Sequence, residues 1–169
     1  PGNLAAIISG LLLPFALAPY DIWPLAIISP LLILFLVQNL NPGKSALRGW
    51  FYGVGVFGMG VPWVYVSMHD YANTPAPLAI LLTGLFAAGL ALFFCLQFYI
   101  FGRFIQKHKY ANLIGFPALW LLFEWLRSWL FTGFPWLYLG DSLLDTWLAS
   151  LAPVVGVYGL GLILTLSAS

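Results

Sequence analysis

Charged side chains are scarce in this chain of 169 residues. Asp, Glu, Lys and Arg make up 7% of it, whereas about 25% is typical of soluble domains, so a soluble monomer is excluded. Six Lys and Arg residues spread along the sequence cannot form the basic surface that neutralises nucleic-acid phosphates. Intrinsic disorder is excluded as well, because it requires low hydrophobicity and high net charge, and the net charge here is +1.

Cysteine and clustered metal ligands are lacking too. The single cysteine, Cys95, excludes an intramolecular disulfide and a cysteine-rich zinc site. It lies in apolar surroundings, where a thiol is unreactive, so we expect it to serve in packing. His69 and Asp70 are adjacent, but no second histidine or carboxylate stands at ligand spacing. We therefore predict neither a metal site nor a cofactor.

Apolar residues dominate instead, at 62% of the chain. A membrane-crossing helix needs about 20 mostly apolar residues, so the sequence predicts a polytopic transmembrane helical bundle, an all-α fold of about six spans. The expected spans are Leu4–Ala18, Ile22–Leu40, Gly49–Val66, Leu78–Gly102, Leu113–Leu130 and Leu148 to the chain end. The first contains Pro14 and the second follows it closely, so this pair is either two tilted spans or one re-entrant hairpin.

The positive charges predict how the bundle lies in the membrane. Five of the six Lys and Arg residues fall in the second and fourth connections, namely Lys44, Arg48, Arg103, Lys107 and Lys109. Short cytoplasmic loops carry such an excess. We therefore expect the N-terminus and the even-numbered loops in the cytoplasm, and the odd-numbered loops on the opposite side.

One glycine-rich stretch matches a nucleotide-binding pattern without predicting a nucleotide site. Residues Gly53 to Gly58 read G-x-G-x-x-G, but this pattern is meaningful only between a strand and a helix, and here it lies inside an apolar span. We interpret Gly49, Gly53, Gly58 and Gly60 as small residues that let helices approach closely in a membrane.

Glu124 and Arg127 are the main candidates for a functional site inside a span. They stand three positions apart on the fifth expected span, hence on one helix face and within pairing distance. Charges at membrane depth are costly and often mark function. Two interpretations stay open. The first is functional: the two residues bind a lipid phosphate or orient the next loop, since arginine offers a planar donor fork. The second is structural: they form an ion pair with each other, or Arg127 extends to a lipid headgroup.

The loop after this span carries a Gly-Phe-Pro turn, which is typical of a shaped loop rather than a generic connector. Its aromatic residues also fit a plain interfacial anchor belt. The third connection lies on the same side of the membrane, and we expect the two loops to line one cavity that opens to the outer leaflet. Their candidate binding residues are Phe134, Pro135, Trp136, Tyr138, Trp63, Tyr65 and His69.

Short segments along the whole chain follow a recognisable pattern. They are, in chain order, Leu17–Pro24, Gly53–Gly58, Trp63–Ser67, Pro117–Trp120, Glu124–Arg127, Leu130–Trp136, Leu151–Pro153 and Gly156–Tyr158. With these segments, the sequence resembles the N-terminal membrane domain of the bacterial apolipoprotein N-acyltransferase family. Their order and spacing extend across essentially the whole chain. The segment Leu130–Trp136 is the most specific of them.

The resemblance implies a reaction and its substrates. Members of the family take an acyl chain from a membrane phospholipid and transfer it to the free α-amino group of the diacylglyceryl-cysteine that begins an apolipoprotein. The reaction passes through a thioester on a cysteine, with a glutamate as general base and a lysine that stabilises the oxyanion. In the family these three residues belong to a nitrilase-like domain on the periplasmic side of the bacterial cytoplasmic (inner) membrane.

We expect residues 1–169 to be the N-terminal membrane domain of a larger protein, with the nitrilase-like domain beyond the chain end. Cys95 does not match the family nucleophile, so we assign no catalytic residue to this chain. The resemblance instead implies that the loop around Trp136 and the face of Glu124 and Arg127 bind and admit lipid substrates.

Two other interpretations stay open. One is a polytopic transporter or scaffold without catalytic activity, which calls for polar residues deep in several spans or for paired interrupted helices. Glu124 is the only carboxylate expected within a span, which disfavours it. The other is a domain fused to, or serving, a polyprenyl-phosphate mannosyltransferase, as in some proteins that resemble this family.

Overall fold

The computed structural model describes all 169 residues and contains helices but no strand, which confirms the predicted all-α class. The α-helices are α1 (Gly2–Leu12), α2 (Leu25–Val37), α3 (Pro42–Gly60), α4 (Pro62–Val66), α5 (Ala76–Ile100), α6 (Phe116–Trp129) and α7 (Ala152–Ser167). Short 3-10 or π-helical turns extend or link them at Leu13–Ala16, Ser67–Tyr71, Phe101–Ile105, Ala111–Gly115, Leu130–Thr132, Leu139–Leu143 and Trp147–Leu151.

Proline marks where most of these helices begin. A proline stands in the first turn of each helix from α3 to α7, where its missing N–H has no helical partner to lose and its fixed φ suits the helix. Asn41 also caps α3, because its side-chain oxygen accepts a hydrogen bond from Lys44 N at 2.8 Å. The prolines therefore divide a nearly continuous apolar sequence into separate helices.

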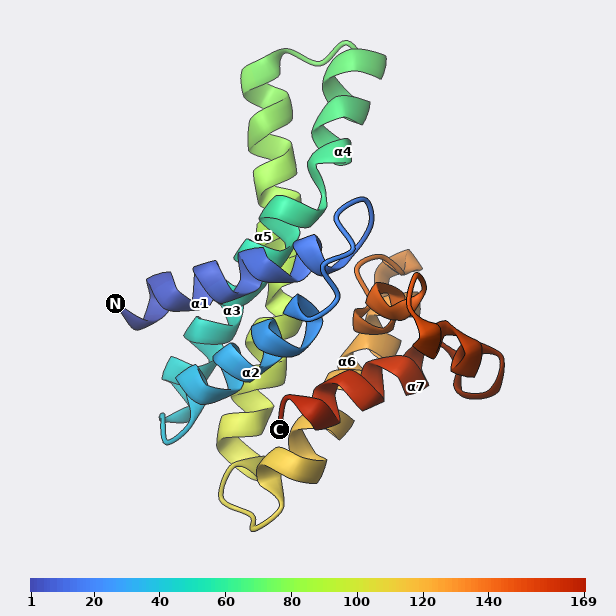
Figure 1. Ribbon diagram of the computed structural model, residues 1–169. Helices are drawn as coiled ribbons and strands as arrows, with labels where there is room; N and C mark the ends of the chain where they lie inside the picture. The colour runs from blue at the N-terminus through green and yellow to red at the C-terminus, as the bar shows by residue number, and fades with distance from the viewer.

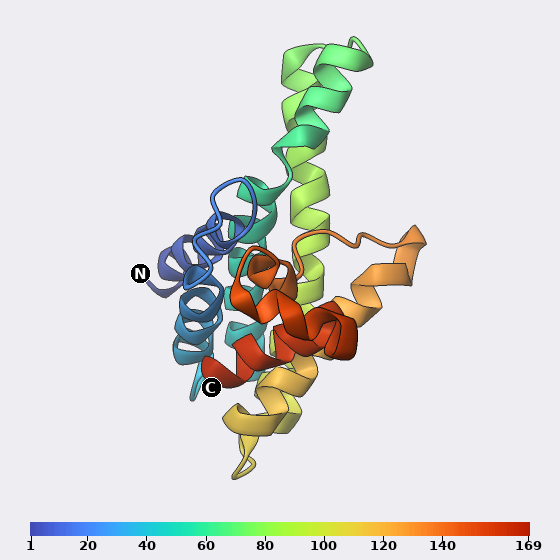
Figure 2. The ribbon, with the colours of Figure 1, turned by 45° about the vertical axis from the view of Figure 1, so that its right-hand side comes forward.

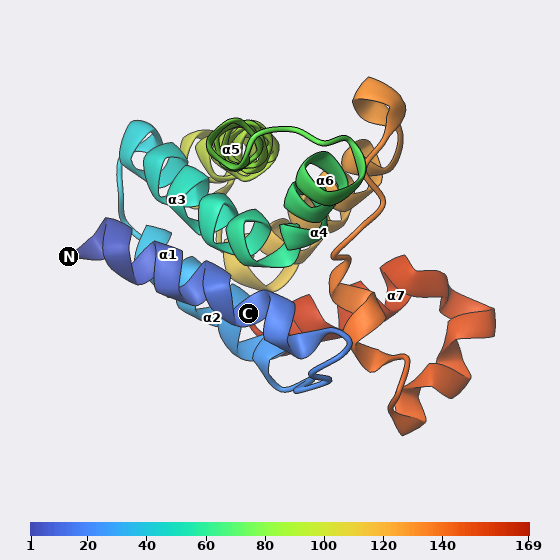
Figure 3. The same ribbon diagram turned by 90° about the horizontal axis from the view of Figure 1, so that it is seen from above.

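Helix α5 is the longest and runs most of the height of the molecule in Figure 1. Helix α3 packs along it, and α1 and α2 form a helical hairpin that covers α3 (Figure 3). Helix α4 lies beside the N-terminal part of α5, and together they project above the other helices (Figure 2). Helix α6 contacts both α5 and α7, and so lies between these two helices.

Two glycines allow the close approach of α3 and α5. A Cβ on Gly53 would stand 2.8 Å from Ala91 Cα, and one on Gly49 would stand 2.5 Å from Phe94 O. Such distances are too short for any side chain, so the role predicted for these two glycines is confirmed. Gly58 differs, because nothing lies within 4 Å of a Cβ placed there. The prediction of a close helix approach at Gly58 is wrong.

The structure does not confirm the expected number of spans. Two apolar helices are long enough to cross a membrane, Ala76–Ile105 and Trp147–Ser167. Pro42–Gly60 and Pro62–Tyr71 add a third if this pair, bent by 56°, forms one span. Gly2–Ala16 and Leu25–Val37 are apolar but shorter. The structure therefore supports a helical membrane protein without confirming six spans.

Breaks in the backbone interrupt some of the expected spans. Helix α3 ends where Val61 leaves the helical region (φ −125°, ψ 37°), immediately before Pro62. Helix α6 begins only at Phe116, after the π-helical turn Ala111–Gly115. It ends where Leu130 is extended (φ −67°, ψ 137°), which is also the end of the fifth expected span. Within α7, Gly156 adopts φ 65° and ψ 179°. The length of an apolar run does not show where the chain leaves the helical conformation. A prediction from apolar runs therefore overestimates the length of continuous helix.

Candidate functional site

An aromatic core forms where α3, α5 and α6 meet. The ring of Tyr52 lies 5.0 Å from that of Phe94 and 6.1 Å from that of Trp120, between centroids. The Ser29 hydroxyl donates to the carbonyl of Ser9 at 2.7 Å, so the Tyr52 hydroxyl is the donor in its 2.8 Å bond to Ser29 Oγ. These buried bonds join α1 and α2 to Tyr52 in the core.

Glu124 extends from α6 inside this core and is 5% exposed. Its Oε1 accepts hydrogen bonds from Leu139 N at 2.8 Å and from Trp120 Nε1 at 3.2 Å. Its Oε2 is buried without a hydrogen-bond partner. A buried carboxylate is costly unless it is hydrogen-bonded. The bond to Leu139 therefore fixes the far end of the loop that follows α6.

Arg127, 4% exposed, holds the middle of the same loop. Its Nη1 donates to Trp136 O at 2.5 Å and its Nη2 donates to Leu137 O at 3.3 Å. The guanidinium carbon lies 5.4 Å from the ring centroid of Phe57 and 5.2 Å from that of Tyr138, within the range of cation–π attraction. The arginine is thus held between two rings and two carbonyls.

Glu124 and Arg127 are not each other's hydrogen-bond partners, contrary to the pairing that their spacing predicts. The spacing places both side chains on one helix face, but each side chain forms its hydrogen bonds with backbone groups of the loop. The anion binds an N–H and the cation binds carbonyls. Of the two interpretations left open by the sequence, this geometry supports orientation of the next loop.

The loop itself has an unusual backbone. Phe131 (φ 54°), Thr132 (φ 74°) and Gly133 (φ 86°) are consecutive residues in the left-handed region, where non-glycine residues are uncommon. A Cβ on Gly133 would collide with the carbonyl of Ser128, so only glycine fits. Each strained residue costs about 1–3 kcal/mol and persists only where its surroundings hold it. The structure thus confirms a shaped loop.

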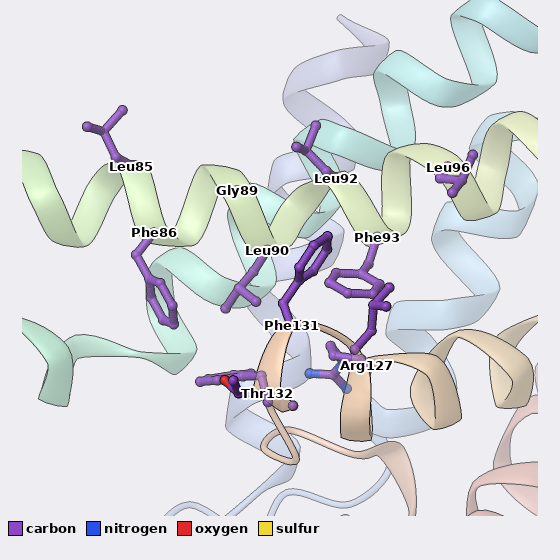
Figure 4. A pocket seen from close by; sticks show the side chains of 13 residues that line it. Leu85, Phe86, Gly89, Leu90, Leu92, Phe93, Leu96, Arg127, Phe131 and Thr132 are labelled. Carbon is purple, nitrogen blue, oxygen red and sulfur yellow. The ribbon is translucent and has the colours of Figure 1, made fainter.

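An open apolar cavity of about 700 Å³ lies between this loop and α5. Its α5 side is formed by Leu85, Phe86, Gly89, Leu90, Leu92, Phe93 and Leu96, and its other side by Arg127, Leu130, Phe131, Thr132, Gly133 and Phe134. Figure 4 shows the ring of Phe131 directed toward α5. Arg127 is the single charged residue of the lining. The cavity can therefore hold a long apolar group beside one cation.

Comparison with known proteins identifies the family. The profile of the "Apolipoprotein N-acyltransferase N-terminal domain" matches residues 9–169. The chain belongs to this family. The apolipoprotein N-acyltransferase of Pseudomonas aeruginosa is 49% identical over 172 aligned residues, which cover 100% of this chain and 34% of that protein. That of Coxiella burnetii is 45% identical over 163 residues, 95% of this chain and 34% of that protein.

A third relative extends the same pattern. The apolipoprotein N-acyltransferase of Azotobacter vinelandii is 46% identical over 172 residues, which cover 100% of this chain and 33% of that protein. The chain thus spans about a third of the length of the curated relatives it matches. The family resemblance predicted from the sequence is confirmed, and the bacterial relatives and apolar helices agree with a bacterial membrane protein.

Two of the predicted candidates, Arg127 and Phe134, line the cavity. Trp136 lies beside it, with its ring centroid 5.1 Å from that of Phe134. Its ring also lies 5.8 Å from that of Trp63 in α4. The two loops were expected to line one cavity together, but Trp63, Tyr65 and His69 are not among the lining residues. Trp63 and Trp136 contact each other outside the lining, which α5 completes instead.

The remaining candidates do not line the cavity. Pro135 is exposed, and Tyr138 is buried with its ring 5.6 Å from that of Tyr158. Tyr65 and His69 stack at 5.3 Å in the projecting segment, where His69 Nδ1 lies 2.9 Å from Thr74 O. These contacts are local, so the structure does not bring Tyr65 and His69 into the cavity.

The α5 wall is the part that sequence reasoning missed. Its residues recur three or four positions apart between Leu85 and Leu96 and so share one helix face. Because α5 is apolar on every side, no polar face marks which side is turned to the cavity. The available signal was Gly89, a residue that weakens a helix and yet stands among large apolar ones.

Proposed function

We propose that this chain is the membrane domain of a phospholipid-dependent apolipoprotein N-acyltransferase, and that its cavity holds an acyl chain of the donor phospholipid. The observation that carries the proposal is the apolar cavity between α5 and the strained loop, with Arg127 as its only charged lining residue. Family membership supports the reaction. Apolar walls with a few placed polar groups are typical of sites for small ligands.

The proposed reaction is an acyl transfer. An ester bond of the phospholipid breaks, and an amide bond forms to the α-amino group of the N-terminal diacylglyceryl-cysteine of an apolipoprotein. The neutral amine gives up one proton, and the lysophospholipid leaves with one proton on the oxygen that carried the acyl group. We expect the nucleophilic cysteine, the glutamate and the lysine in a nitrilase-like domain of the whole protein. This chain would bind the donor and orient its acyl chain toward that domain.

The charge of the lining favours the donor over the acceptor. The acceptor carries an amine, which is cationic when protonated, whereas the cavity lining contains a cation and no carboxylate. A phospholipid brings neutral acyl chains and an anionic phosphate. A guanidinium suits such oxyanions, and Arg127 keeps further N–H donors beyond those bound to Trp136 and Leu137.

We place this domain in the bacterial cytoplasmic membrane with all six apolar segments embedded. In this arrangement α1 and α2 are tilted spans or a re-entrant hairpin, the N-terminus and even-numbered loops are cytoplasmic, and the odd-numbered loops are periplasmic. The cations of the second and fourth connections support this orientation. The strained loop and Trp136 then lie on the periplasmic side.

Acyl transfer by the full-length gene product in lipid nanodiscs tests the proposal. The substrates are a phospholipid with a labelled acyl chain and a diacylated lipopeptide with a free N-terminus, with the N-acetylated lipopeptide as the control. We expect label on the free peptide and none on the control. A folded protein that transfers no label would overturn the proposal and favour a transporter or scaffold.

A further inference from the structure

Gly89 lies at the centre of the α5 wall of the cavity. The wall extends from Leu85 to Leu96, which is about 16 Å along a helix that rises 1.5 Å per residue. One leaflet of a bilayer contributes about half of its hydrocarbon core of roughly 30 Å. The wall is therefore as long as one acyl chain of a bilayer lipid, and Gly89 stands near its midpoint.

The space beside Gly89 is empty. Nothing lies within 4 Å of a Cβ placed on this residue, although the residue lines the cavity. The Cβ of a larger side chain at this position contacts no other protein atom, and the rest of the side chain extends into the open space. Since Gly is also the weaker helix former, a substitution is compatible with the fold of α5. Position 89 thus controls how much of the cavity is available to a ligand.

We propose that Gly89 determines the length of the acyl chain that the cavity accepts from the donor phospholipid. The inference rests on the proposed function and adds a specificity residue to it. A side chain at position 89 narrows the cavity near its midpoint, whichever end the chain enters. Long acyl chains then lose their contacts with the far half of the α5 wall, while short acyl chains still bind against the near half.

Gly84 provides a matched control. It lies on the same helix, is exposed like Gly89 and has nothing within 4 Å of a placed Cβ, but it does not line the cavity. Gly84→Leu therefore adds the same side chain and the same gain in helix propensity without narrowing the cavity. Gly89→Ala adds a smaller group at the test position and gives an intermediate step.

The experiment compares these variants in the full-length protein in nanodiscs, with donor phospholipids carrying laurate, myristate, palmitate or stearate. For Gly89→Leu we expect the rate ratio of stearate to laurate to fall at least about tenfold, since even one methylene in an apolar pocket discriminates by about tenfold or more. Gly89→Ala shifts the ratio in the same direction by less. Gly84→Leu keeps the wild-type ratio.

The outcomes separate the two proposals. If the folded wild type transfers no chain from any donor, the proposed function fails and the inference fails with it. If the wild type is active and Gly89→Leu keeps the wild-type chain-length profile, or loses all donors equally, only the inference is overturned. A second arm varies the acyl length of the acceptor lipopeptide. A shift in that arm instead of the donor arm also overturns it.

Discussion

The carboxylate of Glu124 accepts a hydrogen bond from the backbone N–H of Leu139, fifteen residues further along the chain, at 2.8 Å. One turn along α6, Arg127 binds the carbonyls of Trp136 and Leu137. Two opposite charges thus bind opposite backbone groups of one loop. That loop directly follows the residues that form one side of the cavity. Glu124 and Arg127 therefore position this side of the cavity.

The hydrogen bond from Leu139 predicts different effects for two substitutions of Glu124. Glu124→Leu leaves the N–H groups of Leu139 and Trp120 without an acceptor, and each buried unpaired group costs about 1–3 kcal/mol. Glu124→Gln keeps an oxygen at the same place. We expect the leucine variant to unfold at a clearly lower temperature than the glutamine variant in detergent micelles. Equal unfolding temperatures would show that the loop does not depend on this acceptor.

Arg127→Lys tests whether the two carbonyl contacts require the fork of a guanidinium. A lysine keeps the positive charge, but its ammonium group is a compact point charge without the planar pair of N–H donors that binds two carbonyls side by side. We expect backbone amides at positions 136–139 to exchange hydrogen about tenfold faster, because a bond to a charged group contributes about 1.5–3 kcal/mol. Exchange as slow as in the wild type would mean that charge alone holds the loop.

Trp136→Ala should lower acyl transfer in the full-length protein while leaving membrane insertion intact. The substitution removes the ring that packs against Phe134 and Trp63, and so loosens the loop side of the cavity. Trp129→Ala is the control, since Trp129 is 51% exposed, close to the 49% of Trp136, and packs on Trp125 instead. Full activity of the Trp136 variant would contradict a role of this ring in shaping the cavity.

Gly53→Ala and Gly58→Ala should have opposite effects on stability. At Gly53 the new methyl would stand 2.8 Å from Ala91 Cα, and overpacking of this kind costs about 1–3 kcal/mol. At Gly58 nothing lies within 4 Å, so the better helix propensity of alanine, worth up to about 1 kcal/mol, prevails. Thermal unfolding of both variants in one detergent checks the pair. A destabilised Gly58 variant would contradict the account.

Asp141 predicts a pH effect on stability. Burial raises the pKa of its carboxyl above the ordinary value, so the folded protein holds this proton more tightly than the unfolded chain. Its contribution to stability is present below the unfolded pKa and is lost as pH rises through the folded pKa. Asp141→Asn should therefore be more stable than the wild type at neutral pH, with the difference vanishing in acid. Parallel pH profiles would contradict this.

The sequence predicted the helical class, the shaped loop and the buried charges, because apolar content, turn residues and the cost of a charge in a membrane are local properties. It overestimated the length of continuous helix, since Val61 and Gly156 leave the helical conformation inside apolar runs. Proline and glycine mark such breaks. Composition alone does not give the angle at which the chain continues.

The cavity was only half predictable. Arg127 and Phe134 carry chemical signals that single them out, so both were candidates before the fold was known. The α5 wall carries none, because Leu90 and Phe93 look like any residues of an apolar span. Their role depends on which face α6 and its loop approach, and that is set by long-range packing rather than by local sequence.

The central claim is that the cavity between α5 and the strained loop holds the acyl chain of the donor phospholipid. Its most direct test is an experimental structure of the full-length protein in nanodiscs with bound phospholipid. The account predicts density for one acyl chain along Leu90 and Phe93, beside Gly89 and facing Phe131. A cavity that is collapsed or filled by the protein's own side chains, with the lipid chain bound elsewhere, would contradict it.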